Sequence, residues 1–109
     1  MKRIRWLGDT LNVVRALPAE VRNRIGTELR YVQQGDMPSD WKPMVTVGTG
    51  VQEIRIKVGN QYRVFYVVKF AESVYVLHVF YKKTRRTARE DLELGAKRYR
   101  DGLAERREK

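Results

Sequence analysis

The stretch VQEIRIKVGNQYRVFYVVKF, residues 51–70, decides the fold of this chain. In residues 51–58 apolar and polar side chains alternate, which predicts a strand with one buried and one solvated face. The two faces are Ile54, Ile56 and Val58 on one side and Glu53, Arg55 and Lys57 on the other. Gly59 and Asn60 follow, and both residue types favour a turn.

Two further strands are expected after this turn. Residues 61–70 are apolar on both faces apart from Arg63 and Lys69, as in a strand at the centre of a sheet. Residues 71–73 turn the chain back, and VYVLHVFYKK at 74–83 predicts the next strand. An unpaired cation in a central strand is costly, so we expect Arg63 to meet a phosphate or a protein partner.

Helical periodicity precedes these strands. A short first strand at 4–7 leads to a helix with Asp9 as its N-cap, and a second helix starts after Pro18. The two helices share an apolar stripe at helical spacing, formed by Leu11, Val14, Leu17, Val21, Ile25, Leu29 and Val32. Gly35 ends the second helix, and DMPSDWKPM at 36–44 is expected to be a loop because it holds two prolines.

The C-terminal part predicts one more helix. Thr87 and Glu90 have the spacing of a capping box and open a helix that continues to Leu103. The charged residues 104–109 are expected to fray. The sequence therefore predicts a single α+β domain over residues 1–109, with an N-terminal helical hairpin packed on a small antiparallel sheet and a C-terminal helix.

Strand parity predicts which side chains share a face. If both turns have odd-length loops, paired residues keep the same parity. The helical hairpin would then cover the even positions Ile54, Ile56, Val58, Val64, Tyr66, Val68, Val76, His78 and Phe80. The opposite face would gather Glu53, Arg55, Lys57, Arg63, Tyr81 and Lys83. A two-residue loop at Gly59 and Asn60 would reverse the pairing of the first two strands.

Composition narrows the class of partner. The 23 Lys and Arg against 13 Asp and Glu give a formal charge of +10 and a pI of about 10.2, so the natural partner is a polyanion. Nucleic acid, an acidic protein and an anionic membrane surface all satisfy this charge. With no cysteine and His78 as the one histidine, we expect no disulfide, no metal site and no cofactor. The start MKRIRWLGDTLNVV lacks the apolar run of a secretory signal, and no stretch is long enough to span a membrane, so a cytoplasmic protein is expected.

A resemblance to a known family adds to these inferences. The stretches WLGDTLNVVRALPAEVRNRIGTEL, GDMPSDWKPM, GVQEIRI, YRVFYVV and LHVFYKKTRRTAREDLELGAKR resemble, in this order, the phage-derived HigB-like toxins of the RelE/ParE superfamily. The resemblance covers residues 4 to 100 and is sharpest at EIR (53–55), YRVFY (62–66) and FYKKT (80–84). It implies a RelE-like fold and the toxin of a type II toxin–antitoxin pair. It further implies that the toxin enters the ribosome and cleaves messenger RNA. The implied partner is a HigA-like helix-turn-helix antitoxin, through which alone the complex contacts promoter DNA.

Cleavage of RNA without a metal defines the candidate catalytic residues. The 2′-hydroxyl attacks the adjacent phosphate, which requires alignment, stabilisation of negative charge and two proton transfers. The resemblance places Arg55 and Arg63 in the EIR and YRV motifs, and guanidinium groups bind phosphate oxygens at two points. Lys82 and Lys83 stand where the family has basic active-site residues. Parity favours Lys83, whereas the resemblance does not separate the two.

Other residues have a functional and a structural explanation. Tyr81, expected beside Arg63, would stack on a nucleobase or take part in proton transfer. Stacking is favoured, because an ordinary tyrosine pKa of about 10 makes the side chain a poor general base unless nearby cations lower it. Glu53 would act either as the base or in a structural ion pair. His78 titrates near neutral pH, but parity places it on the helix-covered face. Candidates for contacts with the RNA backbone are Lys57, Arg85 and Arg86, although charge on a solvated sheet face is the preferred explanation for Lys57.

Two rival functions fit the same features. One is a noncatalytic inhibitor of DNA gyrase, as on the ParE side of the superfamily, and the other is an inactive basic RNA-binding relative. A shared fold does not determine a shared activity. The Lys82–Lys83 pair and the two motif arginines favour the nuclease.

Overall fold

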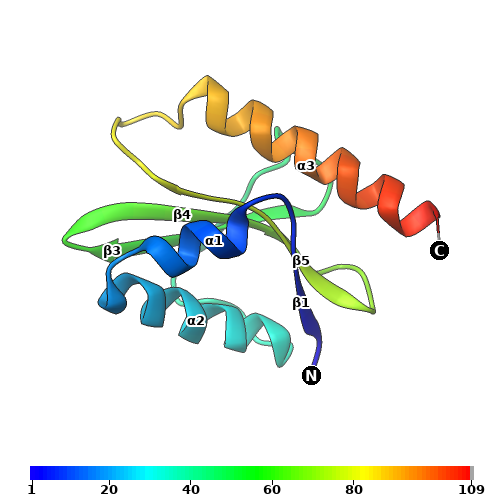
Figure 1. Cartoon of the computed structure of the whole chain (residues 1–109), viewed down its shortest axis with the longest axis horizontal. Helices are drawn as coiled ribbons and strands as arrows, with labels where there is room; N and C mark the ends of the chain where they lie inside the picture. The colour runs from blue at the N-terminus through cyan, green and yellow to red at the C-terminus, as the bar shows by residue number, and fades with distance from the viewer. Residues whose placement is uncertain (109) are drawn as a thin grey trace.

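The computed structural model describes residues 1–108, which form a five-stranded sheet and three helices. The strand order in the sheet is β1-β5-β4-β3-β2. In chain order the elements are β1 (Arg3–Trp6), α1 (Thr10–Ala16), α2 (Ala19–Gln33), β2 (Trp41–Pro43), β3 (Val51–Val58), β4 (Asn60–Val67), β5 (Ser73–Tyr81) and α3 (Arg89–Arg107). Figure 1 shows α1 and α2 on one side of the sheet and α3 on the other. The predicted α+β class is confirmed.

The sheet is mixed, so the expectation of a purely antiparallel sheet was wrong. The predicted first strand is present as β1, but it pairs in parallel with β5, with Ile4 opposite Val74. The chain thus begins with a strand, and the helical hairpin follows it. The segment 36–44, expected to be a loop, contains β2, which pairs with β3. Side-chain alternation carries no information on strand direction, because parallel and antiparallel strands share the same period.

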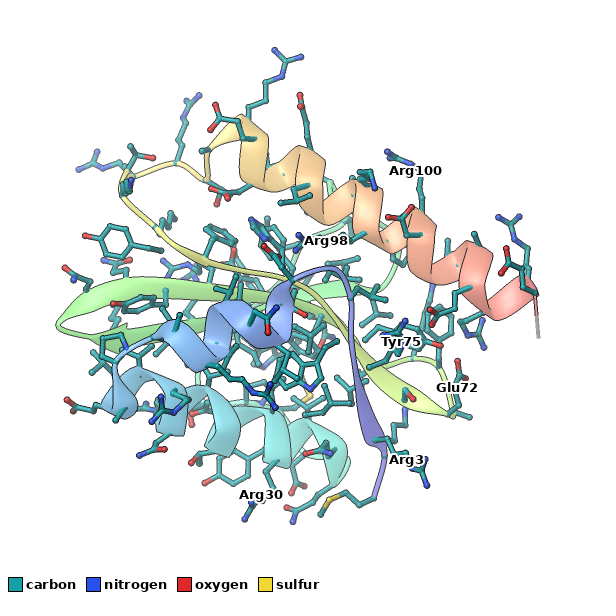
Figure 2. All side chains as sticks on the ribbon, viewed as in Figure 1. Arg3, Arg30, Glu72, Tyr75, Arg98 and Arg100 are labelled. Carbon is teal, nitrogen blue, oxygen red and sulfur yellow. The ribbon has the colours of Figure 1, made fainter. Side chains whose placement is uncertain are left out.

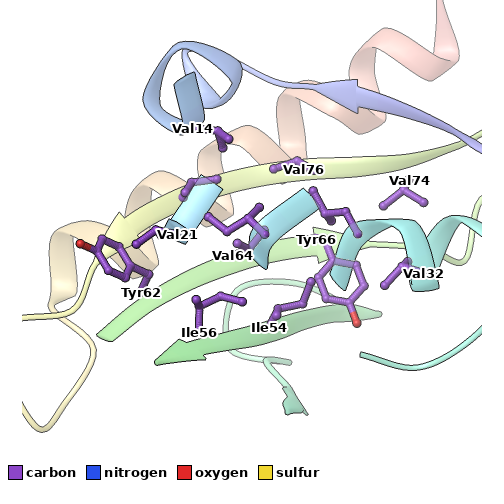
Figure 3. Close-up of a cluster of buried hydrophobic side chains, with 13 residues drawn as sticks. Val14, Val21, Val32, Ile54, Ile56, Tyr62, Val64, Tyr66, Val74 and Val76 are labelled. Carbon is purple, nitrogen blue, oxygen red and sulfur yellow. The ribbon is translucent and has the colours of Figure 1, made fainter. Parts of the chain in front are cut away.

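The helical hairpin packs on one face of the sheet, as predicted. Its buried side chains Val14, Val21, Ile25, Leu29 and Val32 meet the sheet residues Ile54, Ile56, Val64, Tyr66 and Val76 in one cluster (Figure 3). Burying an aliphatic side chain of this size contributes about 1.5–3 kcal/mol, so this stripe is a major source of stability. Asp9 precedes α1 as predicted, but its side chain makes no cap hydrogen bond and binds Arg98 of α3 instead.

Helix α3 covers part of the opposite face. Its residue Tyr99 packs against the cluster that contains Phe65, Val67 and Leu77 of the sheet. The helix approaches the sheet closely at Gly95, where an added Cβ would lie 2.8 Å from a ring carbon of Phe65. The β3–β4 turn lies beyond the N-terminal end of this helix, at the left in Figure 1.

Both ends of α3 differ from the prediction. The helix begins at Arg89 after an extended Ala88 without a side-chain cap, so the capping box expected at Thr87 does not form. At its other end the helix continues to Arg107, so residues 104–107 are not frayed. The guanidinium of Arg106 lies 3.8 Å from the ring centre of Phe70 and bonds to Glu72, which lies below the end of the helix in Figure 2. Residue 109 lies outside the described residues.

A bulge in β5 changes which of its residues share a face. Phe65 pairs with His78, but Tyr66 pairs with Val76, so the pairing skips Leu77. An extra residue of this kind reverses the side-chain parity on one side of the bulge. The carbonyl of Leu77 accepts a hydrogen bond from Arg98 of α3 at 3.1 Å, which satisfies a backbone group at the irregularity. Arg98 lies between α3 and α1 in Figure 2.

Candidate functional site

The β3–β4 hairpin assembles the charged residues on the α3 side of the sheet. Arg55 lies opposite Arg63, and Lys57 lies opposite Gln61. This pairing keeps the same parity across the turn, as predicted, because Gly59 alone separates Val58 from Asn60. Gly59 has a φ of +71°, a conformation that glycine adopts without strain. The prediction that Glu53, Arg55, Lys57 and Arg63 share one face is therefore confirmed.

Glu53 is a fully buried carboxylate at the base of this group. Its side chain has 0% exposure, and its Oε1 atom lies 3.3 Å from the Nε of Arg55 and 3.5 Å from the Nε of Arg63. Its other oxygen, Oε2, has no hydrogen-bond partner in the described structure. An unpaired buried carboxylate would be very costly, so Glu53 depends on an ion pair inside the fold. Because no solvent reaches Glu53, a bulky phosphodiester cannot reach it either.

Arg63 finds its partner within the chain. Only 3% of the residue is exposed, and its terminal nitrogen atoms donate to the Tyr62 carbonyl at 3.0 Å and to the Gln61 side chain at 2.9 Å. Burial lowers the pKa of the Arg63 guanidinium and Glu53 opposes this shift, but an arginine stays charged in a protein. Glu53 therefore takes the place of the external partner expected for Arg63. The ion pair inside the fold offsets the free-energy cost of burying this cation.

Lys82 joins this group, and Lys83 does not. Beyond the bulge Arg63 pairs with Phe80, so Lys82 rather than Lys83 follows on the Arg63 face, and the parity argument for Lys83 was wrong. Burial is the main cause of a lowered pKa for Lys82. The positive charge of Arg63 lowers this pKa further, and Glu53 raises it. The backbone N–H of Lys82 donates to the Gln61 carbonyl at 2.8 Å, which fixes the end of β5 beside the β3–β4 hairpin.

Tyr81 lies on the other side of the sheet from the position predicted. It pairs with Tyr62, and the two rings meet edge to face with centres 5.6 Å apart. Tyr81 is 41% exposed. The bulge at Leu77 explains the difference, because the prediction assumed an uninterrupted strand. Tyr81 therefore does not share the sheet face of Arg63.

His78 was also assigned to the wrong face. It lies on the α3 side, stacked on Phe80 with ring centres 4.7 Å apart. Its Nε2 lies 2.7 Å from Oδ1 of Asp91, in the first turn of α3, and its Nδ1 has no partner in the described structure. Burial lowers the pKa of His78, and Asp91 opposes the shift. A neutral ring that donates from Nε2 to Asp91 fits this environment and ties β5 to α3.

Residues 12–100 match the family described as phage derived protein Gp49-like (DUF891). The chain belongs to this Gp49-like family. No curated protein sequence matches the chain. The match spans α2 and all five of the residues that we considered catalytic, namely Arg55, Arg63, Tyr81, Lys82 and Lys83. β1 lies outside it.

Two grooves border the site of this Gp49-like protein. The first has a volume of about 500 Å³ and runs between the β3–β4 turn and the residues after β5, with Lys83 and Arg85 among its lining. The second, of about 420 Å³, lies toward the start of α3 and includes the acidic Glu90 and Asp91. Of the other predicted RNA contacts, Lys57 and Arg86 are exposed, and neither of them lines either groove.

Three residues near the site were missing from the sequence prediction. Lys42 lies opposite Glu53, because its segment forms β2 rather than a loop. Gln61 holds Arg63, and its polar side chain at the start of an otherwise apolar strand was a signal that could have identified it. Asp91 depends on the placement of α3. Within residues 1–108 no cluster of three or more potential metal ligands occurs, and no helix there has the length and apolar character needed to cross a membrane.

Proposed function

We propose that this Gp49-like protein is the toxin of a type II toxin–antitoxin pair in the cytoplasm, and that it cuts messenger RNA on the ribosome. Its partner would be a helix-turn-helix antitoxin. One observation carries the proposal: Arg55 and Lys82 reach solvent beside a buried Glu53–Arg63 ion pair. A net charge of +10 favours approach to RNA.

We assign different roles to the cations. Arg55 has 34% side-chain exposure and faces Glu53 through Nε, so its terminal nitrogen atoms are the part suited to two non-bridging phosphate oxygens. Lys82 supplies a second positive charge from the position directly after β5. Arg63 lies behind them and acts as a positioning residue, because its donors bind Tyr62 and Gln61. This division of roles replaces the earlier expectation that Arg63 itself grips the phosphate.

The proposed cleavage reaction needs no cofactor. The 2′-oxygen of the RNA bonds to phosphorus, its proton passes to solvent, and the bond from phosphorus to the 5′-oxygen breaks. The departing 5′-oxygen takes a proton from the Lys82 ammonium, and the products are a 2′,3′-cyclic phosphate and a 5′-hydroxyl. Because burial and Arg63 lower the pKa of Lys82, its ammonium is a stronger acid than an ordinary lysine. A positioned proton donor accelerates such steps by about 10²- to 10⁴-fold.

The test is brief expression in a bacterium, followed by mapping of new messenger RNA 5′ ends. Wild type should produce new ends in translated frames, and Lys82→Met and Arg55→Ala should lose them. Arg100→Ala is the matched control, since it removes one exposed positive charge from α3 (labelled in Figure 2), away from the site. Gyrase supercoiling is assayed alongside.

The alternative functions give different results. Growth arrest with intact messages and impaired supercoiling would replace the nuclease with gyrase inhibition. Salt-dependent RNA binding without fragments would leave an inactive RNA-binding relative. Loss of new ends in Arg100→Ala as well as in Lys82→Met would show that total charge, and not this site, drives the effect.

A further inference from the structure

The groove of about 500 Å³ beside the site has a composition suited to a nucleotide. One wall is the turn residue Gly59 with the first two residues of β4, Asn60 and Gln61, and the other runs from Tyr81 to Arg85. This lining includes three cations, Lys82, Lys83 and Arg85, and no acidic residue. The neighbouring groove at the start of α3 contains Glu90 and Asp91. Of the two grooves, the first is therefore the one that favours an anionic strand.

The orientation of the Gln61 side chain follows from its hydrogen bond to Arg63. Arginine has only donors, so the Gln61 atom that lies 2.9 Å from Nη2 of Arg63 must be the carbonyl oxygen Oε1. The amide NH₂ of Gln61 is then the group left for a ligand, and Gln61 is exposed in the lining of the groove. Arg63 thus fixes a hydrogen-bond donor at the groove wall. No side-chain acceptor for this NH₂ is present among the residues described.

Tyr81 provides an aromatic surface on the same groove. Its ring is held edge to face by the buried Tyr62, yet 41% of the residue is exposed. Tyr81 is the last residue of β5 and pairs with Tyr62, whereas Lys82 follows it next to Gln61, so the two residues border the groove at the end of the sheet. An exposed tyrosine held in place by its neighbour is suited to stack on an unpaired base.

We propose that this groove binds one nucleotide of single-stranded RNA, next to the phosphate held by Arg55 and Lys82. The base stacks on Tyr81, and the Gln61 NH₂ donates to an acceptor atom of the same nucleotide. This assignment rests on the proposed function, because it takes RNA to be the ligand. It makes Tyr81 a binding residue that takes no part in the chemical step, and it adds Gln61 to the site.

The test uses the full chain and a six-nucleotide single-stranded RNA with 2′-O-methyl groups, which cannot be cut by its own 2′-hydroxyl. Binding is measured by fluorescence anisotropy. Tyr81→Ala should weaken binding about 5- to 100-fold, the range of one base stacked on an aromatic ring, and Tyr81→Phe should bind like wild type. Gln61→Glu keeps an oxygen for Arg63 but replaces the NH₂ with a second carboxylate oxygen, so binding should fall about 10-fold or more.

A probe lacking one base locates the nucleotide. Removing the base at one position should weaken binding to wild type and leave binding to Tyr81→Ala unchanged, because that variant has already lost the stack. Unchanged thermal unfolding of each variant shows that the fold is intact.

The proposal is overturned if wild type does not bind the probe, or if Tyr81→Ala and Gln61→Glu both bind like wild type. Cleavage is followed separately with an unmodified RNA on ribosomes. Absence of cleavage together with the expected binding pattern would reject the nuclease and support the nucleotide site, so the two failures are distinguishable.

Discussion

Removal of the buried charge at Glu53 should destabilise the protein strongly, because the residue is fully buried in an ion pair. Glu53→Leu leaves Arg63, which has 4% side-chain exposure, without its counter-ion. Breaking a buried pair from one side costs about 3–5 kcal/mol. This is a large share of the roughly 5–15 kcal/mol by which a domain is stable, and it should lower Tm by roughly 10–20 °C.

The structure also predicts how substitutions combine. Arg63→Met should also destabilise the protein, because the buried Glu53 carboxylate then loses its buried partner and keeps only the partly exposed Arg55 of its two arginine partners. The double variant should be more stable than either single variant, since it buries no charge. Arg55→Met is the control: Arg55 binds the same oxygen but has 34% side-chain exposure, so its loss should cost less than about 1 kcal/mol.

The assay is urea unfolding followed by circular dichroism, with the free energy of unfolding of all four variants compared with wild type. The reasoning would be refuted if each single substitution of Glu53 or Arg63 cost less than about 1 kcal/mol and their effects added within about 0.5 kcal/mol. That result would mean that the two buried charges are not coupled.

Three further predictions concern other parts of the fold. His78 has a pKa below its ordinary value in the folded state, so the unfolded chain binds a proton first as the pH falls through about 6.5. Wild type should therefore lose stability from pH 7 toward pH 5, measured by urea unfolding, and a slope equally steep in His78→Phe would contradict this origin. Gly95→Ala places a Cβ 2.8 Å from a core ring and should cost about 1–3 kcal/mol. Its control Gly26→Ala, with no atom within 4 Å, should stabilise the helix by about 0.5–1 kcal/mol, and equal Tm values for the two variants would reject the packing argument. Glu72 should titrate with a pKa of about 2, because Arg106 hydrogen-bonds to it, and the pKa should rise toward its ordinary value in Arg106→Ala. An NMR titration of the Glu72 carboxyl checks this, and an unchanged value would show that Arg106 is not the cause.

Much of the local structure could be predicted because local side-chain periodicity follows from backbone geometry. The alternation in residues 51–58 indicated a strand with a charged and an apolar face, and the Ile25 and Leu29 spacing indicated the buried side of a helix. The placement of Arg55 and Arg63 on one face was predicted only on the condition of an odd-length loop, and the one-residue turn at Gly59 meets that condition in the structure. The Gp49-like match agrees with the phage-derived relationship that the motifs indicated.

The composition of the site could be predicted only in part. Arg55, Arg63 and Lys82 do gather at one end of the sheet, but their exposure separates them into solvent-facing cations and a buried one. Sequence patterns do not report burial of a charge, because it depends on whether an opposite charge lies within reach. Glu53 meets this condition for Arg63 only after β3 and β4 have paired.

The sequence by itself determined the three helices, the strands other than β2, the apolar faces of α2 and β3 and the strong positive charge. The elements and their faces depend on residues close together in the chain, and the charge depends on composition. The tertiary structure alone decided the direction of β1, the pairing of β2 and the bulge at Leu77. The bulge placed His78 and Lys82 on the α3 side and Tyr81 on the other. A strand's period of two means that one unpaired residue reverses every side chain beyond it. No local pattern in residues 74–83 marks Leu77 as that residue, because the bulge is defined by the pairing of β5 with β4, a neighbour that is not adjacent in the local sequence pattern.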